Sequence, residues 1–80
     1  MNTDWVQVEV HCRSDYTYAQ EPRAVTWPDG FREAIELVEQ RWVFPAGRSF
    51  RVRAPARSLE LCYLQDVDVW QARVIRVHTR

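Results

Sequence analysis

Arginine residues gather in one short segment of the second half of the chain. Four of them lie within ten positions: Arg48, Arg51, Arg53 and Arg57. Arg51 and Arg53 alternate with Phe50 and Val52, so in an extended strand the guanidinium groups would lie on one face and the apolar side chains on the other. Guanidinium groups form bidentate hydrogen bonds with phosphate and carboxylate oxygens. The spacing therefore predicts a basic strand face for an anionic ligand, with these four residues as candidate binding residues.

Two tryptophans complete this candidate site. An exposed Trp5 or Trp70 would stack on a nucleic-acid base, as aromatic side chains do on small β-barrel platforms. A plainer interpretation is that the Arg side chains only cover a solvated face. It is favoured by a formal net charge of zero and an isoelectric point of about 6.7, which are unlike those of a dedicated nucleic-acid binder. Nucleic-acid contact is therefore the alternative prediction for function and not the first one.

Side chains that would catalyse a reaction or hold a metal are sparse. Cys12 and Cys62 are far apart and lack a Cys-x-x-Cys spacing, and His11 is next to Cys12, so on a strand the two would point to opposite faces. Asp66 and Asp68 are typical of a hairpin loop. No nucleophile elbow or Gly-rich phosphate loop is present. We therefore expect no catalytic residue, metal or cofactor, and we do not expect an enzyme.

Charge is divided unevenly between the two halves of the chain. Residues 1–40 carry three Arg against eight Asp and Glu, a net charge of −5, and residues 41–80 carry eight Arg against three, a net charge of +5. Such a division predicts either a basic face for an anionic partner or two halves that neutralise each other across the fold. Two of the later basic residues, Arg73 and Arg76, are three positions apart and would project to opposite faces of an ideal strand.

Alternation of apolar and polar residues predicts most of the chain to be extended. Strands are expected at residues 5–13, 23–27, 49–54, 59–64 and 69–77. Tyr16 and Tyr18 suggest further extended chain, and residues 65–68 are expected to form the hairpin loop between the last two strands.

Residues 31–44 allow two interpretations. An apolar stripe at helical spacing runs along Phe31, Ala34, Ile35, Val38 and Trp42. The turn before it and Pro45 after it would suit a helix at about 30–43, packed on an antiparallel sheet. A strand is the other possibility, but its alternation is poor unless a bulge shifts the faces midway. The α+β fold is therefore kept as the alternative.

The segment before and after this region resembles a known family. It reads Pro22-x-Ala24-x-x-Trp27, then Gly30 followed by Ile35, Val38 and Trp42 at offsets of five, eight and twelve. The later matches are Phe50-Arg51-Val52-Arg53, Leu59-x-Leu61-x-Tyr63 and an acidic loop that leads to Trp70. This pattern, over roughly residues 20–75, resembles a small uncharacterised bacterial domain family, a domain of unknown function.

Members of that family occur alone or attached to the polymerase-like accessory subunit of translesion-synthesis systems. The resemblance implies a β-rich fold in which residues 31–43 are extended and bent, and it offers no catalytic residue to carry over. This chain departs from the family pattern by one extra residue in the turn between Trp27 and Gly30, by Val25 in place of an aromatic residue, and by Leu64-Gln65 in place of Tyr-Asp.

The first prediction is a single all-β domain over residues 1–80, a small SH3-like, partly open barrel of about five to six strands. The predicted core consists of apolar residues: Val6, Val8, Val10, Val25, Trp27, Ile35, Val38, Trp42, Phe50, Val52, Leu59, Leu61 and Tyr63. Trp42 is expected to be buried, so that its truncation would badly destabilise the domain.

The function expected first is a non-catalytic protein-interaction module, an adaptor with a protein partner and with self-association as a further possibility. A link to DNA repair or replication is implied by the resemblance alone. No apolar run of about 18 residues and no signal peptide are visible in the sequence, so we expect a cytoplasmic protein with no membrane partner.

Overall fold

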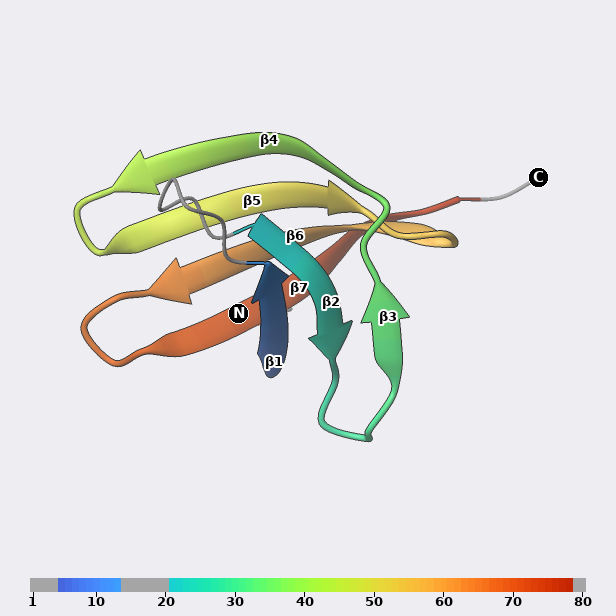
Figure 1. Ribbon diagram of the computed structural model, residues 1–80, viewed down its shortest axis with the longest axis horizontal. Helices are drawn as coiled ribbons and strands as arrows, with labels where there is room; N and C mark the ends of the chain where they lie inside the picture. Colours follow the sequence, from blue (N-terminus) through green and yellow to red (C-terminus); the bar gives the residue numbers. More distant parts are fainter. Residues whose placement is uncertain (1–4, 14–20, 79–80) are drawn as a thin grey trace.

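Seven β-strands make up the fold in the computed structural model, which describes residues 5–13 and 21–78. In chain order they are β1 (Val6–Arg13), β2 (Glu21–Thr26), β3 (Arg32–Ala34), β4 (Leu37–Phe44), β5 (Gly47–Arg53), β6 (Arg57–Leu64) and β7 (Val69–Val77) (Figure 1). They form one sheet in the order β3-β2-β1-β7-β6-β5-β4, and every neighbouring pair is antiparallel. The strands predicted from alternation are confirmed; Tyr16 and Tyr18 lie outside the described residues.

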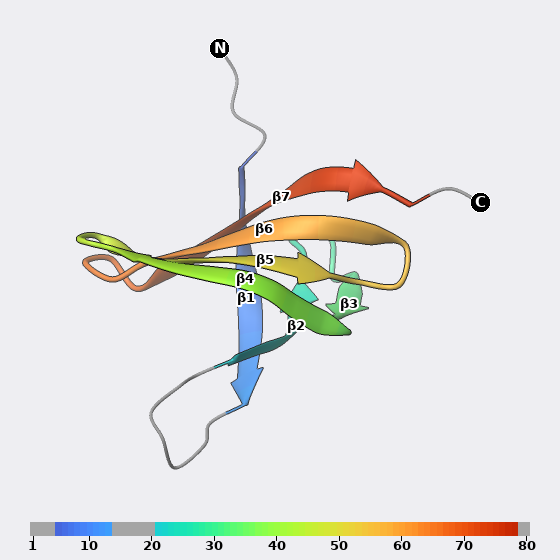
Figure 2. The same ribbon diagram turned by 90° about the horizontal axis from the view of Figure 1, so that it is seen from above.

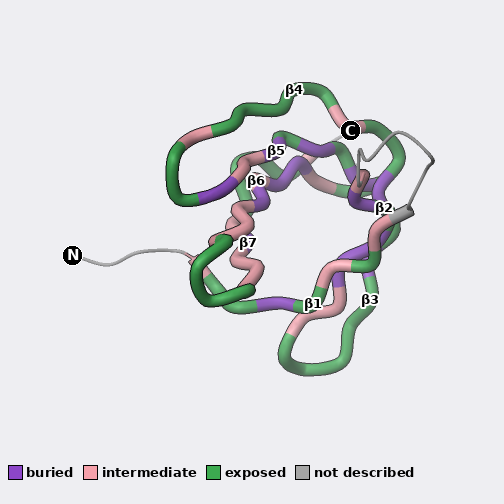
Figure 3. Tube along the Cα trace, turned by 60° about the vertical axis from the view of Figure 1, so that its left-hand side comes forward, coloured by how far each residue is buried: buried purple, intermediate pink, exposed green. Residues whose placement is uncertain are grey.

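The sheet curls into a partly open barrel. Strands β4–β7 run side by side, and β1 runs across them (Figures 1 and 2). The trace returns on itself through β1, β2 and β3, and buried positions occur in strands on both sides of the curl (Figure 3). The all-β, barrel-like prediction is therefore confirmed, although the sheet has seven strands and not five to six. No helix of the described residues is long and apolar enough to cross a membrane.

The segment between β2 and β5 is extended and bent, so the helix over 30–43 is wrong and the bent extended chain is confirmed. The bend lies at Ile35 and Glu36, between β3 and β4. The Ile35 amide donates a hydrogen bond of 2.9 Å to the Arg23 carbonyl, and the Glu36 amide donates one of 2.7 Å to the Arg53 carbonyl. One continuous segment thus pairs first with β2 and then with β5, which brings the two ends of the sheet together.

The core lies inside this curl and comes from six of the seven strands and from the bend. Its buried members are Val8, Val25, Ile35, Phe50, Val52, Leu59, Leu61 and Ala72, with Val10, Trp27, Val38 and Trp70 packed against them. Two residues predicted to be core are exposed. Val6, at the start of β1, is 37% exposed, and Trp42 is 41% exposed. A register shift in β4 explains why the Trp42 side chain is exposed.

The described sheet has three register shifts, and two of them, in β4 and β7, change which face the side chains of the outer strands occupy. In β4, Val38 pairs with Val52 and Gln40 pairs with Arg51, so Glu39 is an extra residue. From that point onward the residues of β4 change faces, and Trp42 points away from the core. In β7, Val74 pairs with Leu59 and Arg76 pairs with Ser58, which leaves Ile75 as the extra residue of a second bulge.

Ion pairs tie the early strands to the later ones. Arg57, in β6, donates two hydrogen bonds of 2.9 Å to the carboxylate of Glu33, in β3. The same carboxylate accepts a hydrogen bond of 2.9 Å from the Trp27 indole, over which the Arg57 guanidinium is stacked. Arg41, in β4, pairs at 2.6 Å with Glu21, in β2. These contacts span the gap that the curled sheet would otherwise leave open.

Candidate functional site

The outer face of the sheet is the face of β4–β7 that is turned away from the core. Phe50 and Val52 of β5 are buried, and Arg51 and Arg53, which alternate with them, are exposed. Both side chains therefore project from the outer face, as the alternation predicted. This face is the candidate binding surface, because it gathers cationic side chains that have no carboxylate partner.

One row across the outer face contains the strongest positive charge. Strand pairing places Arg53 of β5 opposite Ser58 of β6, and Ser58 opposite Arg76 of β7. Side chains that are directly opposite one another leave a sheet on the same face, with Cβ atoms about 4.5–5.5 Å apart. Arg76 joins this row only because of the bulge at Ile75, which corrects the expectation that Arg73 and Arg76 project oppositely.

A hollow of about 400 Å³ lies over this row. It is lined by Glu39, Arg51, Arg53, Ser58, Ile75, Arg76 and His78, and we call it the basic hollow. Both bulge residues, Glu39 and Ile75, are among its walls, so the register shifts help to build it. A volume of this size lies at the lower end of the range for small-ligand sites, about 300–1,000 Å³.

The three arginines of the basic hollow are available to a ligand. Arg51, Arg53 and Arg76 take part in no ion pair with any described residue, whereas Arg41 and Arg57 are paired away from this face, and Arg73, on the same outer face, is paired with Glu60. Glu39 is the one acidic side chain in the lining and forms no ion pair within the described ranges. The three arginines and one carboxylate of the lining therefore sum to about +2.

Ser58 and His78 form the floor of the hollow. Ser58 is buried, and its hydroxyl oxygen lies 2.9 Å from Nε2 of His78. The backbone amide of His78 donates a hydrogen bond of 2.9 Å to the Ala56 carbonyl, which holds the residue after β7 against the β5–β6 turn. The Ser58 hydroxyl thus lies between Arg53 and Arg76 with the His78 imidazole beside it, and both groups are able to donate hydrogen bonds.

Trp42 lies beside the arginines on the same outer face. The guanidinium carbon of Arg51 is 6.0 Å from the centroid of the Trp42 ring, at the outer limit for a cation–π contact. The sequence prediction missed Trp42 as a site residue because the apolar stripe assigned it to the core. The signal that would have found it is the poor strand alternation of 31–44, which already required a bulge.

Two of the predicted arginines do not belong to this face. Arg57 is held by Glu33 in the barrel-closing ion pair, and this hydrogen bond raises the pKa of the Arg57 guanidinium further. Arg48 is three positions before Arg51 in the same strand, so the two side chains leave opposite faces. Arg48 lies on the inner face, directly opposite Tyr63. There its charge acts on Cys12, whose thiol pKa is raised by burial and lowered to a smaller extent by Arg48.

The two predicted tryptophans are also separated. Trp70 packs on the inner face, with its ring centroid 5.8 Å from that of Phe50 and 5.0 Å from that of Tyr63. The Tyr63 hydroxyl donates a hydrogen bond of 2.7 Å to the Asp68 carboxylate, and this bond raises the pKa of Tyr63. Trp5 lies 4.7 Å from the guanidinium of Arg73, at the other end of the outer face from Trp42. Neither ring lines the basic hollow.

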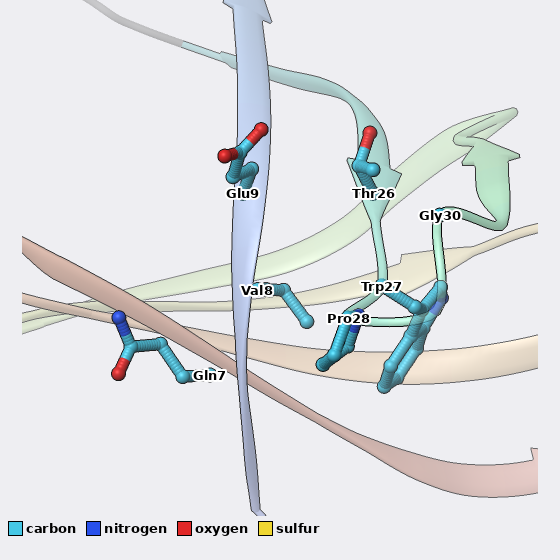
Figure 4. A pocket seen from close by; sticks show the side chains of 7 residues that line it. All are labelled: Gln7, Val8, Glu9, Thr26, Trp27, Pro28 and Gly30. Atoms are coloured by element: carbon cyan, nitrogen blue, oxygen red, sulfur yellow. The ribbon is translucent and has the colours of Figure 1, made fainter.

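A second, larger hollow of about 530 Å³ lies between β1 and the β2–β3 turn. It is lined by Gln7, Val8, Glu9, Thr26, Trp27, Pro28 and Gly30. Val8, Pro28 and Trp27 lie on one side of β1, and the Gln7 side chain points to the other side (Figure 4). Its single charged lining residue is Glu9, and its Trp27 indole N–H is already bonded to Glu33, so it offers fewer groups to a ligand than the basic hollow.

Groups that support metal or thiol chemistry do not come together in the described part of the chain. No three His, Cys, Asp or Glu side chains among the described residues are arranged to hold a metal ion. Cys12 and Cys62 are free thiols. Cys12 follows the inward Val8 and Val10 of β1 at two-residue spacing and faces inward, whereas Cys62 lies between the inward Leu61 and Tyr63 of β6 and faces outward.

Comparison with known proteins gives no relative from which a function could be transferred. No protein-family model, no curated protein and no solved structure matches the chain.

Proposed function

We propose that the protein is a non-catalytic binding module whose outer face holds single-stranded nucleic acid. The observation that carries the proposal is that Arg51, Arg53 and Arg76 gather without carboxylate partners beside the exposed ring of Trp42. Single-strand binding combines a positively charged surface for the backbone with an aromatic ring on which a base stacks. A single strand fits better than a duplex, because its bases are free to stack on Trp42.

The alternation of charge along β5 supports the same ligand. Arg51 and Arg53 are two residues apart on one strand, which separates their positions by about 6.6–6.8 Å along the face. Arg76 extends the basic surface sideways over β7. The zero net charge of the chain does not oppose this, because acidic side chains of the first half are occupied elsewhere: Glu21 by Arg41, and Glu33 by Arg57. A link to DNA repair or replication stays a prediction that rests on the family resemblance alone.

Fluorescence anisotropy of a labelled single-stranded oligonucleotide tests the proposal. Three Arg–phosphate contacts would make the logarithm of the affinity fall with the logarithm of salt with a slope of about −2, or roughly 15–20-fold between 50 and 200 mM salt. Arg51→Ala should weaken binding and lower that slope by about 0.7. Trp42→Ala should weaken binding at every salt concentration, by about 1–3 kcal/mol for one lost base stack.

The matched control is Arg23→Ala with Arg32→Ala, compared with Arg51→Ala with Arg53→Ala. Both double variants lose two exposed arginines and the same charge, but Arg23 and Arg32 lie on β2 and β3 and not on the outer face of β4–β7. The control variant should bind as the parent protein does. Equal losses in the two double variants, or no binding at 50 mM salt, would rule out the proposal.

A protein partner is the second candidate, and the position of β4 favours it. Within the described residues β4 pairs only with β5, and it exposes Leu37 at 54% and Val43 at 83%. An end strand with exposed apolar side chains is able to accept an added strand from another chain. Val43→Lys, which blocks such pairing, should abolish a protein complex and leave oligonucleotide binding intact. If oligonucleotide binding is lost instead, β4 acts through the nucleic-acid face.

A further inference from the structure

We infer that the basic hollow is a seat for a phosphomonoester, which is the phosphorylated end of a strand and not a phosphate inside it. The inference rests on the proposed function for the identity of the ligand, and it assigns a specificity that the proposed function does not contain. Arg53 and Arg76 would hold the phosphate from two sides, over the Ser58 hydroxyl, and Arg51 and Trp42 would hold the adjoining nucleotide.

Spacing across the sheet fits a phosphate between the two arginines. Arg53 and Arg76 are separated by one intervening strand, β6, so their Cβ atoms are about 10 Å apart. Long guanidinium side chains from two such positions are able to converge on one tetrahedral anion, each through two N–H groups. Their intervening neighbour is Ser58, a small side chain that leaves room for the anion above it.

Charge selects a terminal phosphate over an internal one. The lining carries three arginines and one carboxylate, Glu39, which leaves about +2. A phosphomonoester carries about −1.5 to −2 near pH 7, whereas each internal phosphodiester carries a single negative charge. The doubly charged group therefore gains more from this hollow. Arg53 is the last residue of β5, so the hollow lies at the margin of the sheet. A nucleic-acid strand with one base stacked on Trp42 would have its end at this margin.

The Ser58–His78 contact would adjust to the bound phosphate. Ser58 has one O–H to donate, and at present its oxygen lies 2.9 Å from Nε2 of His78. An anion above Ser58 favours the arrangement in which the His78 Nε2–H donates to the Ser58 oxygen and the Ser58 O–H donates to a phosphate oxygen. The hollow thus contains a hydroxyl donor that is already oriented by a second side chain.

Binding of one oligonucleotide with three different ends tests this inference. A labelled single-stranded 12-mer is prepared with a 5′-phosphate, with a 3′-phosphate or with hydroxyl groups at both ends, and anisotropy is measured at 100 mM salt. We expect one of the phosphorylated forms to bind about tenfold more tightly than the hydroxyl form, the effect of added hydrogen bonds to a charged group. Arg53→Ala and Arg76→Ala should each remove the preference.

Control variants distinguish specific binding of the terminal phosphate from non-specific electrostatic attraction. Arg51→Ala should weaken all three oligonucleotides and reduce the preference only in part, because Arg51 would contact the adjoining nucleotide although its charge also belongs to the lining. Glu39→Gln should strengthen the phosphorylated form severalfold, because it removes the one acidic group of the lining. Ring nitrogen chemical shifts of ¹⁵N-labelled His78 should show the Nε2–H form on addition of the phosphorylated oligonucleotide. Thermal melts confirm that each variant is folded.

The outcomes distinguish this inference from the proposed function. Equal affinity for all three oligonucleotides overturns the phosphomonoester seat and leaves single-strand binding in place. A preference that survives both Arg53→Ala and Arg76→Ala also overturns it, because the selectivity would then lie elsewhere. If no oligonucleotide binds but a phosphoserine peptide does, and binding needs Arg53 and Arg76, the proposed function fails and the assignment to a nucleic-acid end fails with it.

Discussion

At the scale of single residues, Glu33 is a buried charged side chain that depends on its hydrogen-bond partners. Its carboxylate is only 6% exposed and accepts hydrogen bonds from both Arg57 and Trp27. Glu33→Ala would leave a guanidinium and an indole N–H without their acceptor. Breaking a buried ion pair costs about 3–5 kcal/mol. Because the Arg57 side chain is 28% exposed, we expect the free energy of unfolding to fall by about 3 kcal/mol, measured from the midpoint of urea denaturation.

The matched control for this loss is Arg41→Ala. The Arg41–Glu21 pair also bridges the early and late strands, but its side chains are 60% and 40% exposed. Exposed pairs contribute about 0–1 kcal/mol, so the control should unfold at nearly the parent midpoint. A similar small change in both variants would mean that the Glu33 cluster does not hold the barrel closed.

Cys12 provides a pH-dependent test on the inner face. Burial raises the pKa of its thiol, and the positive charge of Arg48 opposes part of that shift. The reactive thiolate should therefore form at a higher pH in the folded protein than in urea. In a Cys62→Ser background, the pH midpoint of iodoacetamide labelling, followed by intact mass, should lie above that of the unfolded chain. Arg48→Gln should move it higher still, and a midpoint at or below the unfolded value would contradict the assignment.

At the scale of elements, what the sequence could predict depended on how regular each strand is. β5 and β6 alternate without interruption, so their core residues, such as Val52 and Leu61, and the outward Arg51 were predictable. β4 and β7 each carry a bulge, and a single inserted residue reverses the faces that follow it. Trp42 and Arg76, the two site residues that were misplaced, both follow a bulge.

Contacts between residues distant in the sequence could not be predicted for a different reason. Nothing near Arg57 in the sequence indicates that its side chain pairs with Glu33, twenty-four positions away. Its pairing depends on how the sheet curls, which brings β3 against β6. The basic face was therefore predictable as a property of β5, whereas the membership of the site depends on the closed barrel.

The β4–β5 hairpin offers a test of strand packing. A Cβ atom added to Gly47 would lie 1.8 Å from the backbone oxygen of Tyr63 in β6, so β5 and β6 would have to separate there. We expect Gly47→Ala to cost about 2–3 kcal/mol, at the upper end for overpacking. Ser49→Ala, in the same strand, should change stability by no more than about 0.5 kcal/mol. Equal urea midpoints for the two variants would show that the backbones are not in such close contact.

At the scale of the whole molecule, the division of charge has two consequences at once. Of the three ion pairs in the described part, two join an acid of residues 1–40 to an arginine of residues 41–80: Glu21 with Arg41, and Glu33 with Arg57. The halves therefore do neutralise each other, but only where the barrel closes. Arg51, Arg53 and Arg76, which point outward from β5 and β7, form no ion pair with those acids, so a basic area remains on a chain with no net charge.

Closure of the barrel also predicts how the molecule unfolds. β2 and β6 are not paired with each other, but Val25 and Leu61 belong to the same buried cluster. Leu61→Ala should cost about 2–5 kcal/mol, and amide hydrogen exchange should show the same loss of protection in β2 as in β6, because one core stabilises both. Val67→Ala, in the exposed loop before β7, should leave both unchanged. If β2 kept its full protection in Leu61→Ala, the two sides of the barrel would unfold independently, and the Glu33–Arg57 bridge would not couple them.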